Sequence, residues 1–158
     1  RELVRKYLIP FYERIGKTKK SFILEGHSFI KGSVDNEGQE IKDDITLSDS
    51  SNSILDPKGG IRTAPPGYLD FYAEELSKRL PDLVIGKNSF YNSVYDHIFS
   101  LYSWDGIREK GNRVPIIHQE TDEKLYIRAG KPDLKAIAKL KKAFSESVYQ
   151  TMKHFELL

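Results

Sequence analysis

Short apolar runs alternate with amphipathic stretches along the chain. Four apolar runs predict buried strands: SFILEG (21–26), DITL (44–47), DLVIG (82–86) and VPIIHQE (114–120). Apolar residues at helical spacing predict three helices, at residues 2–15, 65–80 and 132–155. Strands that alternate with helices indicate an α/β fold, with the four strands in one mixed or parallel sheet that the helices flank.

The sequence predicts a single domain. No internal repeat and no linker interrupts residues 1–158, and this length is sufficient for one hydrophobic core. The polar segment 27–43 and the turn-rich segment 48–67 are expected to be loops, and the aromatic segment 90–105 fits either a helix or a structured loop. The final helix is expected to bury the stripe Leu134, Ile137, Ala138, Phe144, Val148, Met152 and Phe155.

Composition narrows the classes of function. A net charge of +2, from 25 basic and 23 acidic residues, predicts no nucleic-acid partner. No apolar run approaches the roughly 18 residues of a membrane span, so no membrane partner is expected. The absence of cysteine excludes disulfides and thiolate chemistry and favours a reducing compartment, which predicts a cytoplasmic protein.

Two of the predicted strands end in chemically similar residues. The first passes from FIL (22–24) directly into EGHS (25–28), and the fourth passes from II (116–117) into HQETD (118–122). With a strand period of two, the His, the Glu and the Asp of the second motif point the same way if the strand continues. An imidazole and a carboxylate at neighbouring strand ends suit a zinc hydrolase, in which His binds the metal and a carboxylate outside the ligand set accepts a proton from water.

The same residues have simpler interpretations. A His at a strand end is most often a hydrogen-bonding surface group, and a Glu there is usually a solvated charge. The sequence holds no HxxE, HxxH or CxxC pair that would identify a metal site by spacing, and no GxSxG or phosphate-binding loop pattern. A further arrangement is open, in which His27 and His118 both bind a metal directly and Glu120 or Asp122 completes the site, provided that the two strands are adjacent.

An ordered series of motifs resembles the N-formylglutamate amidohydrolase family. The series is LEGHS (24–28), DDITLSD (43–49), TAPPGYLDFYAEEL (63–76), VIGKNSFY (84–91) and IIHQETDEKLYI (116–127). Members of that family, which belongs to the zinc carboxypeptidase-like group, pass through an Asp-x-His-Ser strand end, an Asp-Ile-Val-Leu-Gly-Asp strand and a Gln-x-Glu-x-Asn-Arg strand end followed by Leu-Tyr. The likeness covers roughly residues 5–127, and the final helix fits it too.

The resemblance implies a fold, an activity and several site residues. The implied fold is a zinc-peptidase-like (phosphorylase/hydrolase-like) layered α/β fold with a mixed, mostly parallel sheet. The implied activity is zinc-dependent hydrolysis of the amide bond of a small N-acyl (N-formyl) amino acid. His27 matches a zinc ligand of the family, and Ser28 follows it as in the related carboxypeptidases. Glu120 matches the general base, which accepts a proton from the activated water and passes it to the leaving amine.

Departures from the family pattern concern the substrate. His118, Asp122 and Glu123 stand in place of the family's Gln, Asn and Arg, and the last change puts a repelling charge where a cation would suit a substrate carboxylate. Arg62 roughly occupies the place of a family Arg and is a candidate to hold that carboxylate. Tyr95 and His97, from the aromatic segment 90–105, could bind the polar end of the substrate together with Arg62. The substrate-binding candidates are Ser28, Arg62, Tyr95, His97 and His118.

The family's first two metal ligands precede the first predicted helix. The resemblance therefore implies that zinc needs ligands upstream of Arg1, and that residues 1–158 form the carboxy-terminal part of a longer domain. We expect the chain alone to bind zinc weakly, to hydrolyse nothing and to expose a sheet edge where another strand belongs. Two other functions stay open: a non-catalytic relative that acts as a binding domain, and a peptidase or cell-wall amidase of the same zinc group.

Overall fold

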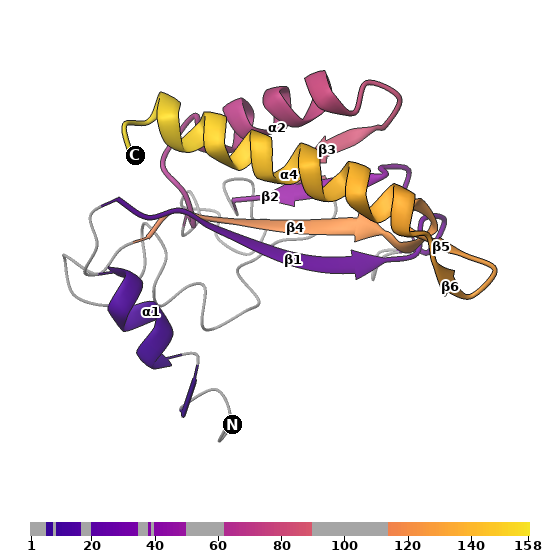
Figure 1. Ribbon diagram of the computed structural model, residues 1–158, viewed down its shortest axis with the longest axis horizontal. Helices are drawn as coiled ribbons and strands as arrows, with labels where there is room; N and C mark the ends of the chain where they lie inside the picture. The colour runs from indigo at the N-terminus through magenta and orange to yellow at the C-terminus, as the bar shows by residue number, and fades with distance from the viewer. Residues whose placement is uncertain are drawn as a thin grey trace.

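A computed structural model describes residues 6–7, 9–16, 20–34, 38, 40–49, 62–89 and 114–158 of the chain (Figure 1). Its elements are, in chain order, α1 (Ile9–Gly16), β1 (Ile23–Phe29), β2 (Ile45–Ser48), α2 (Tyr68–Arg79), β3 (Ile85–Lys87), β4 (Ile116–Asp122), the 3-10 helix η3 (Glu123–Leu125), β5 (Ile127–Arg128), β6 (Lys131–Pro132) and α4 (Leu134–His154). All four predicted strands are present, as β1 to β4. The aromatic segment 90–105 lies outside the described residues.

The four predicted strands form one sheet in the order β1-β4-β2-β3. β1 runs parallel to β4 and β2 runs parallel to β3, while β2 and β4 are antiparallel. The sheet is therefore mixed and mostly parallel, as the sequence predicted. β1 lies at one edge of this sheet and β4 separates it from β2 (Figure 1). β5 and β6 form a separate two-stranded hairpin.

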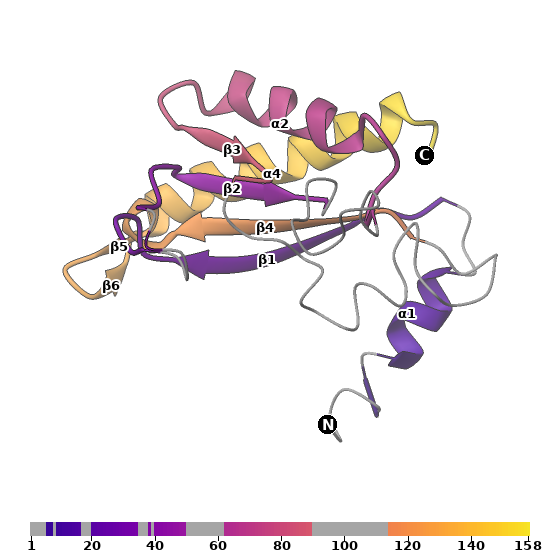
Figure 2. The same ribbon diagram turned by 180° about the vertical axis from the view of Figure 1, so that it is seen from behind.

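Two helices, α2 and α4, cover one face of the sheet. They lie side by side over the same face in both views (Figures 1 and 2). The core between the helices and the sheet is apolar and contains Ile45, Leu47, Ala64, Tyr68, Leu69, Tyr72, Ala73, Leu76, Leu80, Ile117, Leu140 and Ala143. Within the described residues, α1 runs from Ile9 to Gly16 with Pro10 in its first turn, and it lies away from this helical layer (Figure 2).

The ends of α2 and α4 follow local sequence signals. α2 is preceded by Gly67, whose φ of 89° is a left-handed conformation that glycine adopts without strain. Asp133 begins α4, and its side chain accepts hydrogen bonds from the backbone N–H groups of Lys135 and Ala136. No helix among the described residues combines the length and the apolar composition that crossing a membrane requires.

The buried face of α4 matches the predicted stripe in part. Phe144, Val148 and Phe155 of that stripe are half-buried against the core, whereas Leu134 is 77% exposed and Ala138 is exposed. The fully buried residues of the helix are Leu140, Ala143, Ser147 and Thr151. Two of the four carry hydroxyl groups, which a search for apolar positions passes over. The Thr151 hydroxyl donates to the carbonyl of Ser147 within the helix at 2.8 Å, so it can be buried without a distant partner.

Alternation along the strands gives the sheet two different faces. Ile117 of β4 projects into the core under the helices, and Gln119 projects the same way because it lies two positions further on. The Tyr72 hydroxyl of α2 donates to Oε1 of Gln119 at 2.8 Å. Burial raises the pKa of Tyr72, so the phenol stays a neutral donor. The helices therefore cover the face of the sheet that carries Leu24 of β1 and Ile117 of β4. The opposite face carries the candidate site.

Candidate metal centre

Two matched rows of polar side chains cross from β1 to β4. The parallel register places Glu25 opposite His118 and His27 opposite Glu120. Residues two positions apart in a strand project from the same face, so all four side chains project away from α2 and α4. Both strands end later than the sequence predicted. β1 runs to Phe29 instead of residue 26, and β4 runs to Asp122 instead of residue 120.

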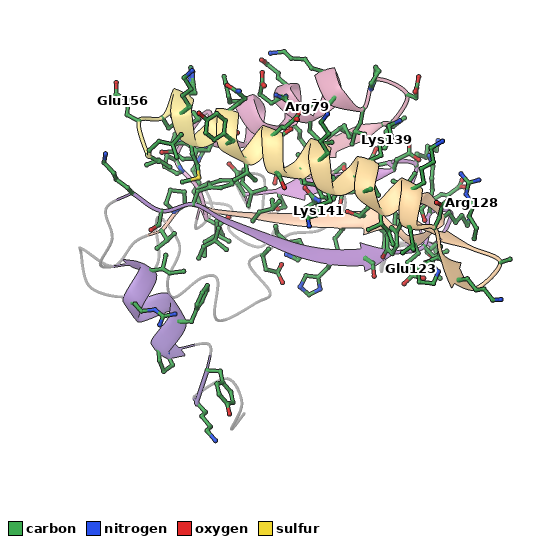
Figure 3. All side chains as sticks on the ribbon, viewed as in Figure 1. Arg79, Glu123, Arg128, Lys139, Lys141 and Glu156 are labelled. Atoms are coloured by element: carbon green, nitrogen blue, oxygen red, sulfur yellow. The ribbon has the colours of Figure 1, made fainter. Side chains whose placement is uncertain are left out.

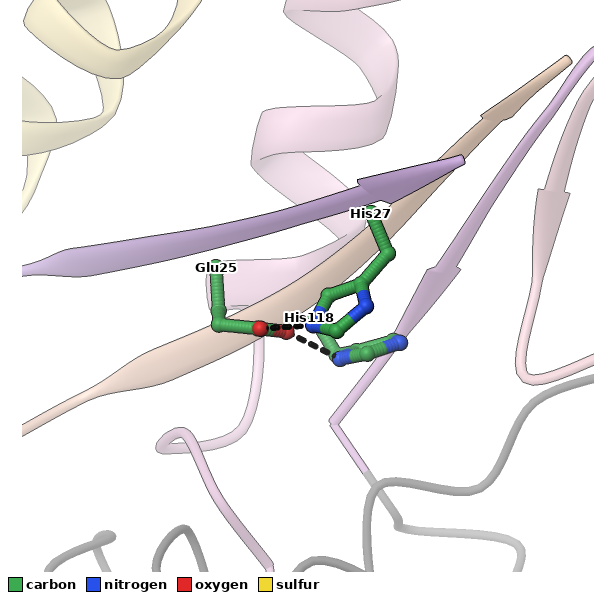
Figure 4. A group of neighbouring side chains, drawn as sticks. All are labelled: Glu25, His27 and His118. Carbon is green, nitrogen blue, oxygen red and sulfur yellow. Dashed lines mark hydrogen bonds and ion pairs between the residues drawn. The ribbon is translucent and has the colours of Figure 1, made fainter. Parts of the chain in front are cut away.

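The carboxylate of Glu25 faces two imidazole rings and contacts both (Figure 4). Its Oε1 contacts Nε2 of His27, and its Oε2 lies 2.5 Å from Nδ1 of His118. The two rings have centroids 5.0 Å apart and planes inclined by 34°. One ligand atom from each of these three residues lies within 4.8 Å of the others. We call Glu25, His27 and His118 the metal group.

Glu120 of β4 lies beside the metal group. Its Oε1 lies 3.0 Å from Nε2 of His118, so the imidazole of His118 stands between two carboxylates. Glu120 is only 6% exposed. Its Oε2 is buried and has no hydrogen-bond partner within the described part of the chain. Buried carboxylate oxygens are normally satisfied, so this atom is available to a bound molecule.

Electrostatics at the metal group favour a positive charge. Burial by itself raises the pKa of Glu25, but His118 and His27 outweigh burial and hold that pKa below its ordinary value. Burial by itself lowers the pKa of His118, but hydrogen bonds and charges from Glu120 and Glu25 outweigh it and raise the pKa of His118 to about 9. These carboxylates thus stabilise an added proton strongly, and the same arrangement suits a bound cation.

The carboxyl end of β2 reaches the same region from the other side of β4. Ser48 lies opposite His118 in the antiparallel register and is 2% exposed. Asp49 follows and is also buried, with its Oδ1 accepting a hydrogen bond from Nδ2 of Asn88 at 2.9 Å. The backbone N–H of Asp49 in turn donates to Oδ1 of Asn88 at 3.1 Å. This reciprocal pair fixes the end of β2 beside the metal group.

Arg62 lies next to that strand end. The N–H of Thr63 donates to the carbonyl of Asp49 at 2.9 Å, and the carbonyl of Thr63 accepts from the N–H of Ile116 at 2.8 Å. Arg62 is half-buried, and no carboxylate among the residues that the structure describes pairs with its guanidinium. A half-buried cation normally pairs with an anion, so Arg62 is suited to an anionic ligand.

Other residues singled out from the sequence lie off the metal group. Ser28 alternates with His27 and therefore leaves the face that carries the imidazole, and its exposed hydroxyl donates to Oε1 of Glu123 at 3.3 Å. Glu123 follows the end of β4 (Figure 3). Asp122 accepts from the backbone N–H groups of Lys31 and Lys124, which caps η3. The candidates Tyr95 and His97 lie outside the described residues.

Glu25 is the functional candidate that sequence reasoning missed. In place of Glu120 or Asp122, it is Glu25 that joins His27 and His118 in the metal group. A signal was present, because β1 reads Glu-Gly-His where β4 reads His-Gln-Glu. Two such motifs in parallel register place each imidazole opposite a carboxylate. The register between the strands, which the sequence does not specify, was needed to use that signal.

The fold can be compared with known proteins. No protein-family model and no curated protein matches the sequence. The layered α/β fold, with its mixed and mostly parallel sheet, nevertheless has a counterpart among solved structures. The crystal structure of N-formylglutamate amidohydrolase from Ralstonia eutropha JMP134 matches it with a TM-score of 0.58 at 16% sequence identity. The match covers 95% of this chain and 52% of that chain, so this chain spans about half the length of that protein.

The donor set of the metal group fits zinc. Two imidazoles and one carboxylate are a ligand set that catalytic zinc sites use, with a fourth position left for water or substrate. Glu120 supplies what such a site needs beyond its ligands: one oxygen that holds an imidazole in place and a second oxygen that lacks a partner within the described residues. The arrangement can therefore bind a metal ion and accept a proton beside it.

Proposed function

We propose that this chain carries the metal ligands and the general base of a zinc-dependent hydrolase that cleaves the amide bond of a small N-acyl amino acid. The observation that carries the proposal is the convergence of Glu25, His27 and His118, with Glu120 beside them. The fold likeness to N-formylglutamate amidohydrolase supports an amide substrate. This chain spans about half the length of that protein. That it has the activity of a whole enzyme is therefore also proposed.

Glu25, His27 and His118 would hold the zinc ion. Bound there, zinc supplies Lewis-acid activation of water and of the substrate carbonyl. All three donors come from this chain, so the proposed site does not depend on ligands upstream of Arg1. His118, which the resemblance assigned to the substrate, becomes a ligand in this proposal. The Nε2 of His118 faces Glu120, which leaves Nδ1, the nitrogen nearest Glu25, to the metal.

Glu120 would move the proton in the reaction. Its Oε2, which has no hydrogen-bond partner among the described residues, would accept a proton from the attacking water, whose oxygen bonds to the carbonyl carbon. When the C–N bond breaks, Glu120 returns this proton to the leaving amine nitrogen. The Oε1 of Glu120 holds His118 in place meanwhile, so one carboxylate serves both to orient a ligand and to carry a proton.

Arg62 would bind the carboxylate of the substrate. Its guanidinium is half-buried, and its backbone is adjacent to the strand end that lies opposite His118. Glu123, which replaces a family Arg, is hydrogen-bonded to Ser28, whose side chain leaves the face that carries the metal group. Its charge is therefore not directed at the proposed substrate position, and an anionic N-acyl amino acid is compatible with this site.

A hydrolysis assay tests the proposed function. The purified chain is incubated with N-formyl and N-acetyl amino acids, with zinc or with a chelator, and the released amine is measured. Release that requires zinc is the expected result. A chain that binds zinc stoichiometrically and releases no amine from any of these substrates would overturn the proposed reaction while leaving the metal site intact.

A further inference from the structure

The outer side of β1 is accessible for pairing. β4 is the only neighbour of β1 among the described strands, so β1 is an edge strand of the described sheet. Gly26, His27 and Ser28 are exposed, and the His27 side chain is 49% exposed. From Ile23 to Phe29 the strand contains neither Lys nor Pro, the residues that commonly protect an edge from pairing.

The backbone groups that face outward from β1 can be assigned. The N–H of Ile23 donates to the carbonyl of Pro115 at 2.9 Å, so the odd-numbered residues of β1 direct their backbone groups toward β4. Backbone direction alternates along a strand. The N–H and C=O groups of Leu24, Gly26 and Ser28 therefore point away from β4, where no described strand meets them.

We propose that this edge pairs with β1 of a second copy of the chain, antiparallel and centred on Gly26, so that the two sheets join into one. In this register Gly26 lies opposite Gly26 of the second copy, and Leu24 lies opposite Ser28 of the second copy. These are the residues whose backbone groups point outward, so each of these pairs can exchange two hydrogen bonds. The pairing does not depend on the proposed hydrolase activity.

The side chains of Glu25 and His27 select the register. A twofold pairing centred on Glu25 would set two carboxylates against each other, and one centred on His27 would set two imidazoles against each other. The register centred on Gly26 instead places Glu25 opposite His27 of the second copy, and it does so twice. These positions form non-hydrogen-bonded pairs, in which the side chains approach most closely and a carboxylate can accept a hydrogen bond from an imidazole N–H.

A groove beside β1 is suited to the same partner. A cavity of about 490 Å³ lies between β1, β4 and α4, and Leu24, Ile137 and Phe144 are among its apolar lining residues. Lys141, which Figure 3 labels on α4, also lines it. In a twofold pairing of edge strands, the helices of both copies lie on the same side of the joined sheet. The second copy's α4 then faces this groove and covers apolar surface that is open in a single chain.

The pairing would also bring the two metal groups together. Glu25 and His27 of one copy face His27 and Glu25 of the other across the twofold axis. Each metal group would therefore have a carboxylate of the second copy beside its exposed imidazole. In such a dimer, each copy contributes residues to the metal site of the other copy.

A single introduced cysteine reports the register, because the chain has no cysteine of its own. Opposed residues of a hydrogen-bonded antiparallel pair have Cα atoms about 5.5 Å apart, a separation that a disulfide spans. Gly26→Cys is expected to give a covalent dimer under mild oxidation, because a Cβ at Gly26 meets no atom within 4 Å. Ser28→Cys is the matched control, because two such cysteines would lie roughly 13 Å apart along the strands and should stay unlinked.

Sedimentation of the unmodified chain from about 1 to 100 µM tests the association itself. A dimer is expected, and Gly26→Lys should shift it to monomer because two ammonium groups meet at the axis. Gly26→Ala should stay dimeric, and circular dichroism verifies that each variant is folded. A chain that is monomeric throughout this range, a Gly26→Lys variant that dimerises as well as the unmodified chain, or Ser28→Cys that cross-links as readily as Gly26→Cys would overturn the proposal. In the first case the edge would be open to a different chain.

Discussion

Oε2 of Glu25 lies 2.5 Å from Nδ1 of His118, although the two residues belong to different strands. The contact follows from the parallel register, which sets the two residues opposite each other on β1 and β4. Both side chains project from the face of the sheet that α2 and α4 do not cover. The pair therefore depends on the pairing of two strands, and any change in register would separate the metal group.

The first prediction concerns the stability of the zinc-free protein. The pKa of His118 is raised to about 9 from an ordinary 6.5, since Glu120 and Glu25 favour the imidazolium despite burial. Its contribution to the free energy of unfolding is fully present below pH 6.5 and is lost as the pH rises through 9. Thermal unfolding with a chelator should show a falling Tm across this window, which corresponds to a loss on the order of 1–3 kcal/mol.

Two variants separate this effect from general alkaline destabilisation. His118→Gln should flatten the dependence of Tm on pH between 6.5 and 9. His154→Gln, which changes an exposed histidine near the end of α4, should keep it. A His118→Gln variant with the same slope as the unmodified chain would show that another group is responsible.

The second prediction separates metal binding from proton transfer. Glu120→Gln should retain zinc, because the amide still reaches His118. The affinity for zinc should fall about 10–100-fold, because the charged partner of that imidazole is lost. Turnover should fall by roughly 10²–10⁴-fold, because the amide cannot accept a proton. Zinc titration and amine release, measured on the same sample, give both quantities. Glu123→Gln removes the same charge just beyond β4 and should change neither, and unchanged turnover in Glu120→Gln would assign the base elsewhere.

The third prediction concerns the anionic end of the substrate. Arg62→Met should raise KM by roughly 10–100-fold with little change in kcat, the effect expected from the loss of a charge-assisted hydrogen bond. The matched measurement uses a substrate whose carboxylate is replaced by a carboxamide. KM for that substrate should respond little to Arg62→Met. An equal rise in KM for both substrates would indicate that Arg62 acts through the fold.

The fourth prediction concerns the opposite face of the sheet. Tyr72→Phe removes the buried hydroxyl that donates to Gln119 at 2.8 Å and leaves an amide oxygen without this partner. The variant should be about 1–3 kcal/mol less stable to urea, with zinc affinity unchanged. Tyr149→Phe, on the exposed side of α4, should be neutral. A Tyr72→Phe variant as stable as the unmodified chain would show that water replaces the hydroxyl at no cost.

The apolar runs were sufficient to predict which segments form the sheet. The runs that became β1 and β4 were recognised, but the points where they end were not. His27 and Asp122 look like residues beyond a strand end, because polar side chains follow the apolar run. The strands continue because each residue from Ile23 to Phe29 has a register partner in β4, and backbone pairing does not require apolar side chains.

The metal group was less predictable than the sheet. The resemblance made His27 a candidate ligand, and the arrangement with His118 as a second ligand was one of several alternatives. Glu25 was not singled out as a ligand, because a Glu two positions before a His has no distinctive local spacing. Its role depends on which strand lies beside β1 and in which register, and both are decided by tertiary pairing.

The most direct test of the metal group is a calorimetric titration of the purified chain with zinc at pH 7.5. We expect one zinc ion per chain with a Kd below about 1 µM, since three ligands come from the chain itself. Glu25→Ala and His118→Ala should each weaken binding by more than the 10–100-fold that loss of an outer partner costs, and His154→Ala should not weaken it. A site that stays mostly empty at micromolar zinc, or that binds equally well in Glu25→Ala and His118→Ala, would contradict the account.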